Sequence, residues 1–286
     1  MAIDNQKTQI IIEDHVVPQL LTSAIEAYTI GDTTSQRGKT ENKLETFGLL
    51  WGYTLPEREG FPPRIVAVLA TVETSAYRHN GWVKPSLESL GAKREFFETY
   101  WPNLELIGTF HSHPYESLKD IEENKGWQGS GKNDNSGDYE YWPHMHEEIC
   151  SDIDHLAHLI ISVVDLKRKS TRMPDRLPGR EDKSGYTFGA GSYRLWVRGY
   201  ATYKEEIANY IHEHDKVWCA VNEGFEDHLI NLGYQVAVEG SPMDSKGNPY
   251  RYIEALEEVN YLVDDDIELQ IPSLQQRFAD HINPRF

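Results

Sequence analysis

A short apolar run that ends in two histidines constrains the fold of this chain more than any other feature of its sequence. Residues 105–110 read ELIGTF, which is typical of a buried strand, and His111-Ser112-His113-Pro114 follows directly. We expect the strand to end there and the chain to turn, so that both imidazoles converge on one metal ion. A catalytic zinc normally has three protein ligands and an open fourth position. The run therefore predicts a third ligand, a carboxylate, near the end of this strand.

Segments typical of strands and helices alternate along the first two-thirds of the chain. Helical spacing predicts an amphipathic helix over 17–28 with Pro18 in its first turn, and Ser86 is a candidate N-cap for a helix over 86–100. A further helix is expected over 143–153. This order predicts an α/β or α+β fold with a mixed sheet. Strands are predicted at 9–13, 46–54, 65–73, 105–110, 159–165 and 192–203.

Other segments carry weaker signals. Residues 115–137 are polar and rich in glycine and asparagine, which predicts an insertion that forms either a lid or a solvated excursion. Residues 167–191 predict a long loop with a basic start and many prolines and glycines. Beyond residue 205 we expect one or two helices up to residue 234, and then a strand at 235–238.

The charge of the chain is strongly negative and unevenly distributed. Its formal net charge of −18 disfavours binding to nucleic acid or to anionic membranes. Residues 204–286 hold 17 acidic and 6 basic side chains. We therefore expect one domain over 1–204, with the two insertions near 115–137 and 167–191, and an acidic C-terminal extension over 205–286. That extension either docks a partner or stabilises the domain by packing on it.

The composition favours a cytoplasmic protein. The two cysteines, Cys150 and Cys219, form no CxxC pair, so we expect a reducing compartment and no disulfide framework. No apolar run reaches the roughly 18 residues that a membrane helix needs. The first residues, MAIDNQKTQ, lack the basic and then apolar pattern of a secretory signal. We expect no contact with membrane or nucleic acid.

Two separated motifs together resemble one family of zinc proteases. Residues 45–52 read ETFGLLWG, and residues 105–114 read ELIGTFHSHP. Both are similar, in the same order, to the motifs E-T-x-G-x-L-x-G and H-S/T-H-P of the JAMM family (MPN+, JAB domain). The resemblance covers about residues 9–203 and leaves the C-terminal part uncovered. It implies an MPN (JAB) fold with a mixed, mainly antiparallel sheet flanked by helices.

The resemblance also implies roles for individual residues. His111 and His113 correspond to the two histidine ligands of a Zn²⁺ ion. Glu45 corresponds to the catalytic glutamate, which contacts the ion through its water. The serine and aspartate that follow the histidines in the family are not found at the family's spacing, and Asn124 lies in that part of this chain.

Several aspartates remain candidates for the third ligand. We favour Asp138, because a serine lies close before it and a helix and a strand are expected after it. Asp134 is the main alternative, and Asp120 is a further one. Ser136 is the candidate serine that stabilises the oxyanion of the reaction, although it lies two residues before Asp138 where the family has three.

The function implied by the resemblance is that of a zinc-dependent isopeptidase or peptidase. It would hydrolyse the amide bond after the C-terminal glycine of a ubiquitin-like modifier, in deconjugation or precursor maturation. Partners would be the ubiquitin-like protein or its conjugates, with activating (E1-like) or conjugating (E2-like) enzymes as further candidates. The motifs look more like bacterial members, some of which accompany conjugation systems in antiphage defence. Two alternatives stay open: a zinc peptidase or amidase for small peptides, and a non-catalytic MPN scaffold.

Other histidines and an aromatic stripe have simpler interpretations. Residues at i and i+2 of a helix do not share a face, which disfavours a metal role for the pair His144 and His146. We expect His155 and His158 to be surface or core residues as well. The aromatic residues at 139, 141 and 142 are expected to pack or to form a groove wall.

Overall fold

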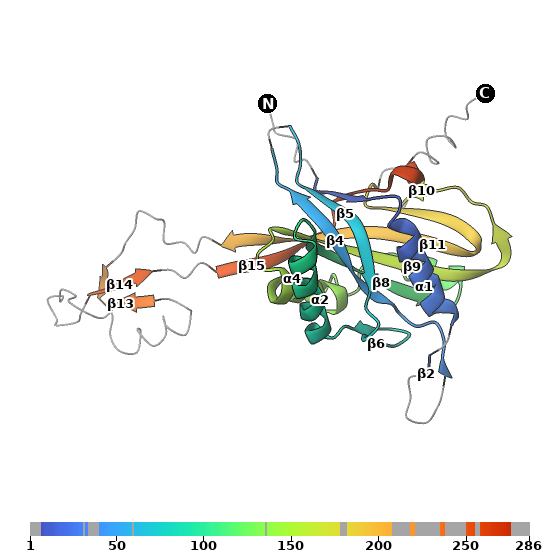
Figure 1. Cartoon of the computed structure of the whole chain (residues 1–286), viewed down its shortest axis with the longest axis horizontal. Helices are drawn as coiled ribbons and strands as arrows, with labels where there is room; N and C mark the ends of the chain where they lie inside the picture. Colours follow the sequence, from blue (N-terminus) through green and yellow to red (C-terminus); the bar gives the residue numbers. More distant parts are fainter. Residues whose placement is uncertain are drawn as a thin grey trace. The chain divides into compact units, whose positions relative to one another are not determined.

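Figure 1 shows the computed structural model of the chain. The chain divides into two compact units, of which the first combines Met1–Tyr203 with Tyr261–Phe286 and the second is Lys204–Asn260. The first unit has an α+β fold built on a mixed, curled sheet, so the expected fold class and the mixed sheet are confirmed. The structure describes residues 7–30, 32–33, 40–58, 60–134, 136–177, 182–207, 218–220, 235–237, 250–254 and 258–275.

The main sheet belongs to the first unit. Its strands lie in the order β10, β11, β9, β8, β4, β5, β1, β16, and β15 pairs with β11 in addition. The pairs β8/β9, β1/β5 and β1/β16 are parallel, and the pairs β4/β5, β4/β8, β9/β11 and β10/β11 are antiparallel. The strands are β1 (Gln9–Ile12), β4 (Phe47–Leu55), β5 (Arg64–Val72), β8 (Glu105–Tyr115), β9 (His155–Ser170), β10 (Asp175–Arg176), β11 (Gly185–Ile207), β15 (Glu258–Asp264) and β16 (Glu268–Gln270).

Helices cover both faces of this sheet. On one face α1 (Val17–Thr29) packs into an apolar cluster that includes Leu50 of β4. On the other face α2 (Leu87–Tyr100) and α4 (Gly137–Cys150) pack into a cluster that includes Leu49. The neighbours Leu49 and Leu50 belong to different clusters because successive side chains of a strand point to opposite faces of the sheet. The expected N-cap of α2 is confirmed, since the Ser86 hydroxyl accepts a hydrogen bond from the Ser89 amide.

The expected insertion at 115–137 packs on the sheet instead of extending into solvent. It contains α3 (Leu118–Glu123), whose Ile121 is fully buried in a cluster with Val164 of β9. Further along, the ring of Trp127 stacks on Trp196 of β11 with a centroid distance of 6.4 Å. Because the segment is mostly polar, its composition did not predict the contacts of these two apolar side chains.

The expected loop at 167–191 is shorter than the sequence predicts. Strand β9 continues to Ser170, and β11 already begins at Gly185. Between them, Asp175 and Arg176 form the short strand β10, which pairs with β11. The basic residues after position 166 lie on a strand that extends beyond the apolar part of the sheet, so their polarity did not mark its end.

The expected C-terminal extension over 205–286 is not one piece. Its last part returns to the first unit, where β15 pairs with β11 and β16 pairs in parallel with β1. Ile267 and Leu269 are buried in the cluster on the α1 face. Residue 204 is therefore where an inserted unit begins, and the first unit does not end there. Ile267 and Leu269 belong to the core of the first unit although they follow the inserted unit in the chain.

The remaining described elements are small. Within the second unit, β12 (Trp218–Ala220), β14 (Tyr250–Glu254) and β13 (Gln235–Ala237) form a three-stranded sheet. The expected strand at 235–238 is thus found, whereas most of the residues of the expected helices up to 234 lie outside the described ones. The first unit also has the pairs β2 (Asp32–Thr33) with β3 (Thr40–Glu41), and β6 (Tyr77–Arg78) with β7 (Val83–Lys84). Among the described residues no helix has the length and apolar character to cross a bilayer.

Two fully buried histidines share the hydroxyl of Thr202. His146 Nε2 lies 2.8 Å from the carbonyl oxygen of Ile153, and its Nδ1 lies 2.9 Å from Thr202 Oγ1. His158 Nε2 lies 3.0 Å from the same hydroxyl, and its Nδ1 lies 2.8 Å from Thr109 Oγ1. A carbonyl only accepts, so His146 donates from Nε2, and its Nδ1 accepts from the Thr202 hydroxyl. The Thr202 oxygen then accepts from His158 Nε2. The remaining nitrogen of His158, Nδ1, accepts from the Thr109 hydroxyl. The expectation of a core role for His146 and His158 is confirmed.

We predict that Thr202→Val lowers the free energy of unfolding by about 2–4 kcal/mol, because it removes the hydroxyl that bonds to a nitrogen of each of two buried imidazoles. Thr99→Val is the control, since Thr99 is exposed on α2. Chemical denaturation of both variants checks this. Equal stability of Thr202→Val and the unchanged protein would show that the hydroxyl is dispensable.

Candidate metal centre

Strand β8 brings both histidines of the HSHP motif to the same face of the sheet. It runs over Glu105–Tyr115, so the histidines lie within the strand and no turn is needed at that point. Residues two apart on a strand share a face, which explains why both imidazoles converge. Phe47 of β4 pairs with His111 in antiparallel register, and on the other side Ile160 of β9 pairs with His111 in parallel register. The expectation that the strand ends before His111 is therefore wrong.

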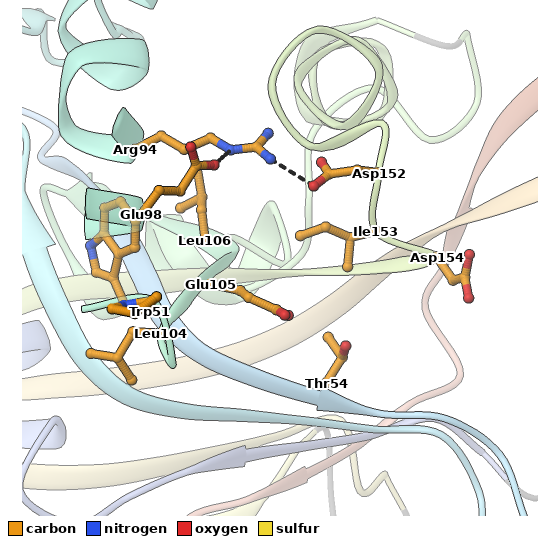
Figure 2. Close-up of a pocket in the computed structure, with 11 residues that line it drawn as sticks. Trp51, Thr54, Arg94, Glu98, Leu104, Glu105, Leu106, Asp152, Ile153 and Asp154 are labelled. Atoms are coloured by element: carbon orange, nitrogen blue, oxygen red, sulfur yellow. Dashed lines mark hydrogen bonds and ion pairs between the residues drawn. The ribbon is translucent and has the colours of Figure 1, made fainter. Parts of the chain in front are cut away.

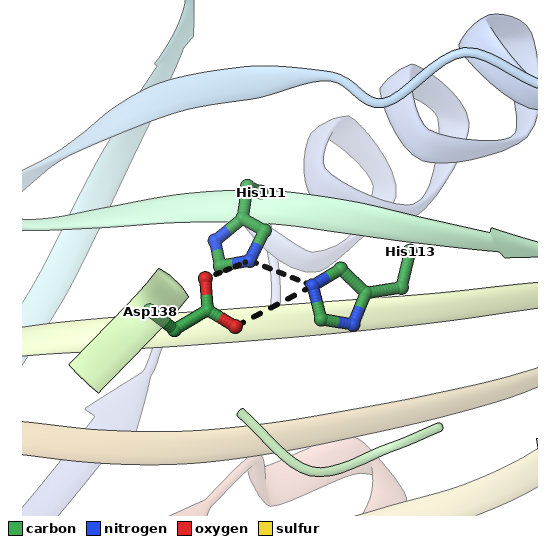
Figure 3. Close-up of side chains that lie close together, drawn as sticks. All are labelled: His111, His113 and Asp138. Carbon is green, nitrogen blue, oxygen red and sulfur yellow. Dashed lines mark hydrogen bonds and ion pairs between the residues drawn. The ribbon is translucent and has the colours of Figure 1, made fainter. Parts of the chain in front are cut away.

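The third member of the group is Asp138, in the first turn of α4. Its Oδ1 lies 3.1 Å from His111 Nε2, and its Oδ2 lies 3.6 Å from His113 Nε2. The two Nε2 atoms are 3.0 Å apart. Figure 3 shows how the two rings and the carboxylate point toward one another. Helix α4 thus supplies the carboxylate that the strand lacks, and the sequence-based preference for Asp138 over Asp134 agrees with this arrangement.

These three side chains could hold a metal ion. Two imidazole nitrogens and one carboxylate oxygen form a donor set found in catalytic zinc sites with an open position. Ligands about 2.0–2.1 Å from a tetrahedral ion lie roughly 3.3 Å from one another, which is close to the observed separations. The donor set also suits other first-row transition metals, so the structure supports a metal site without identifying the metal.

A hydrogen bond outside the group orients His113. Its imidazole bonds to the carbonyl oxygen of Gly126, and the Ser162 hydroxyl donates to the same oxygen at 2.8 Å. Since the carbonyl accepts, the imidazole donates its N–H there, which leaves the lone pair of Nε2 for a cation. Such an outer partner is typical of histidines that bind metals. Gly126 comes from the 115–137 segment, so that segment takes part in building the site.

Ser130 orients Asp138 by three hydrogen bonds. Its amide and its hydroxyl donate to Asp138 Oδ2 at 2.8 and 3.0 Å, and the Asp138 amide donates back to the Ser130 hydroxyl at 3.1 Å. The loop closes tightly because Gly131 and Gly137 have positive φ values of 80° and 55°. A Cβ atom on Gly137 would lie 2.3 Å from Ser130 Oγ. The spacing of serines and aspartates in the sequence did not predict Ser130 as a partner of Asp138, although Gly131 and Gly137 were a usable signal of the turn.

Glu45, two residues before β4 begins, completes the arrangement. It is 6% exposed, and its side chain lines the same pocket as the group. Burial raises its pKa to about 8; the charge of His111 opposes this effect, and the charge of Asp138 adds to it. A carboxyl group with a pKa near neutrality can both take up and release a proton. The sequence-based position of Glu45 beside the histidines agrees with the structure.

The charges of the group shift one another's pKa values. Burial acts to raise the pKa of Asp138, but the two histidines and Ser130 outweigh it and hold this pKa well below its usual range. Burial acts to lower the pKa of His111, but Asp138 and Glu45 outweigh it and raise this pKa. For His113, burial and the charge of His111 lower the pKa to about 4. The group therefore holds an ionised Asp138, a neutral His113 and a Glu45 that is largely protonated near neutral pH, and His111 binds its proton more tightly than a free imidazole.

The pocket over the group has a volume of about 340 Å³. Its far side is formed by the β6–β7 hairpin, including Trp82 and Lys84, and Tyr141 of α4 also lines it. The expectation that Tyr141 forms a groove wall is thus confirmed, whereas Trp82 and Lys84 were missed. None of the described residues of the 167–191 segment belongs to this lining.

Ser136 lies outside the pocket lining. Its hydroxyl donates to Asp134 Oδ1 at 2.8 Å, and Ser130 is the serine in the lining instead. Asp134 is thereby occupied as an acceptor within the loop. Asp120 lies in α3, where it accepts from Asn124. Neither of these two aspartates belongs to the metal group formed by the described residues.

A second pocket lies at the opposite end of β8, near Glu105 (Figure 2). Its volume is about 440 Å³, and it shares no lining residue with the pocket over the metal group. Arg94 bonds there to Glu98 at 2.7 Å and to Asp152 at 2.6 Å. These carboxylates neutralise the arginine, and the pocket contains no cluster of histidines. We therefore place the candidate site at the His111 end of the strand.

The search against family models found no match, and no curated protein matches the chain. The function must therefore be argued from the site.

We predict that metal binding releases protons near neutral pH, since a cation displaces the proton of His111 and favours the ionised form of Glu45. The affinity for Zn²⁺ should rise between pH 6 and 8, by up to roughly tenfold per pH unit for each proton released. Calorimetric titration in two buffers with different ionisation enthalpies measures the number of protons. A binding heat that does not depend on the buffer would contradict the assigned protonation states.

We also predict that Gly137→Ala weakens metal binding by roughly tenfold or more, because the new Cβ atom displaces Ser130 and the left-handed backbone is strained by about 1–3 kcal/mol. Gly91→Ala is the matched control, since a Cβ there meets no atom within 4 Å. Competition with a chelator gives both affinities. If both variants bind metal like the unchanged protein, the closure of the loop does not orient Asp138.

Proposed function

We propose that this chain is a zinc-dependent hydrolase of the JAMM type that cleaves the amide bond after the C-terminal glycine of a ubiquitin-like modifier. One observation carries the proposal: His111, His113 and Asp138 converge in a pocket that also contains the buried Glu45. This is the residue set that the JAMM motifs imply, and it includes a carboxylate that no fixed spacing in the sequence identified. The MPN fold is part of the proposal.

The chemistry follows from the residues that line the pocket. A zinc ion held by the three ligands would supply Lewis acidity, by polarising the substrate carbonyl and lowering the pKa of water. Glu45 would accept a proton from the attacking water and then pass it to the leaving nitrogen of the amide. Its surroundings suit both steps, because burial keeps the two protonation states of its carboxyl close in free energy. The Ser130 hydroxyl donates to Asp138, so its role is to orient that ligand.

Support for an extended substrate comes from the β6–β7 hairpin. Val83 and Lys84 of β7 line the pocket, and β7 pairs with β6 alone among the described strands. An extended chain that adds a strand to β7 would therefore enter the pocket beside the metal group. A modifier tail that ends in glycine fits such a narrow approach, since it needs no side-chain pocket next to the scissile bond. Partners of the E1 or E2 kind, and a place in a bacterial conjugation or antiphage system, are extensions of this proposal.

A peptidase or amidase for small peptides is the second candidate. The pocket volume of about 340 Å³ is in the range of small-ligand sites and favours this alternative as well. Cleavage of a modifier fusion at its terminal glycine, without cleavage of a short peptide of the same sequence, separates the two. Cleavage of both would favour the second candidate. A chain that binds zinc and cleaves neither would support the scaffold alternative.

We predict that Glu45→Gln lowers kcat by about 10²- to 10⁴-fold, the usual contribution of a general base, while the zinc content stays unchanged. Glu105→Gln on the same sheet is the control, because Glu105 lies exposed at the other end of β8. Turnover of the fusion and elemental analysis check both parts. Full activity of Glu45→Gln would exclude this glutamate as the base, and loss of zinc would make it a ligand.

A further inference from the structure

The part of the chain that returns to the first unit at Tyr261, here called the C-terminal return, lies along α4, the helix that carries Asp138. Tyr261 of β15 contacts His146 with a ring centroid distance of 4.7 Å. Two residues later, Val263 packs against the cluster that contains Trp142. Side chains at alternate positions of a strand share a face, and helix positions spaced by three or four residues do so as well. One face of the return is therefore laid against one face of α4.

Asp265 directly follows β15, and its side chain contacts the loop and the first turn of α4 on either side of Asp138. Its Oδ2 accepts a hydrogen bond from the Tyr139 hydroxyl at 3.3 Å and forms an ion pair with Lys132. Lys132 follows Ser130 in the loop, and Tyr139 follows Asp138 in the helix. Asp265 thus joins the two sides of the closure that Ser130 makes with Asp138.

The electrostatic environment of Asp265 agrees with a fixed ion pair. Burial acts to raise the pKa of Asp265, but Lys132 and the Tyr139 hydroxyl outweigh it and hold this pKa below its ordinary value. The Lys132 side chain is 59% exposed and the Asp265 side chain is 33% exposed, so solvent screens the ion pair, and the Tyr139 hydroxyl provides the second, less exposed link. The neighbouring Asp266 differs, because its carboxylate pairs with Lys7 near β1 instead. Adjacent acidic residues therefore serve different parts of the molecule.

We propose that Asp265 is a positioning residue of the metal centre: through Lys132 and Tyr139, it holds the loop and helix turn that aim Asp138 at the two histidines. This inference rests on the metal site of the proposed function and deepens it. It assigns the return segment, which follows the inserted second unit in the chain, a part in metal binding. A residue with this role touches no ligand and acts on the affinity for the metal.

The test compares Asp265→Asn with Asp266→Asn in the full chain. Partners bonded directly to a metal ligand typically contribute 10- to 100-fold in affinity. Asp265 acts one contact further away, so we expect Asp265→Asn to weaken Zn²⁺ binding by about tenfold, the lower end of that range, in competition with a chelator. Asp266→Asn should bind within about twofold of the unchanged protein, because it removes an equal charge away from the loop. Asp265→Glu should recover part of the lost affinity, since it restores the charge.

Hydrogen exchange provides a readout that needs no metal. The amides of Ser130, Asp138 and Tyr139 are donors in the closure, so they should exchange faster in Asp265→Asn and be unchanged in Asp266→Asn. Unchanged exchange and unchanged affinity in Asp265→Asn would overturn the inference. If the unchanged protein binds no metal, the proposed function fails. The exchange comparison then decides alone whether Asp265 holds the loop and the helix turn in place. If Asp265→Asn does not fold, Lys132→Met and Tyr139→Phe probe the same links from the loop side.

Discussion

The register of β8 with its two neighbours is the constraint on which the candidate site depends. Ser112 fixes that register toward β4, because its amide donates to the Thr46 carbonyl at 3.0 Å and its hydroxyl accepts from the Thr46 amide at 2.9 Å. A slip by one residue would turn both imidazoles to the opposite face of the sheet. The same pairing sets Glu45, one residue before Thr46, at the level of the histidines. Ser112 thus holds the register of β8, whereas the two histidines beside it are the candidate metal ligands.

The two carboxyl groups of the site are compensated in different ways. Asp138 is paired with His111 and accepts hydrogen bonds from Ser130, whereas Glu45 is buried with Lys84 as the only lysine or arginine among the described residues that line its pocket, and its raised pKa keeps it largely protonated near neutral pH. Buried carboxylates are normally paired or bound to a metal, because desolvation of a charge is costly. A divalent cation between the two histidines and Asp138 would replace the proton of His111 as the partner of Asp138 and would favour the ionised form of Glu45. The electrostatics and the donor geometry therefore point in the same direction.

Local patterns in the sequence were sufficient for much of the fold. Periodicity found α1 and α2, and apolar runs found the central strands. The ends of β8 and β9 were missed, because both strands continue into polar residues, which are mostly buried at the site in β8 and largely exposed in β9. At the site, the two histidines stood out in sequence, whereas the partnership of Ser130 with Asp138 depends on a loop whose closure is set by glycine backbone angles. Asp265 had no local signal, since its partners lie more than a hundred positions earlier.

The attachment of the second unit has a consequence for how this chain could diversify. The unit leaves the first one after β11 and its chain re-enters at β15, and these two strands are paired. The point where the chain leaves the first unit and the point where it re-enters are therefore both fixed by the pairing of β11 with β15, whatever the length of the chain between them. The entropy of closing such a connection grows only slowly with its length. Changes in the length or sequence of the stretch between β11 and β15 therefore cost the first unit little, so this stretch can diverge in evolution while the two paired strands are retained.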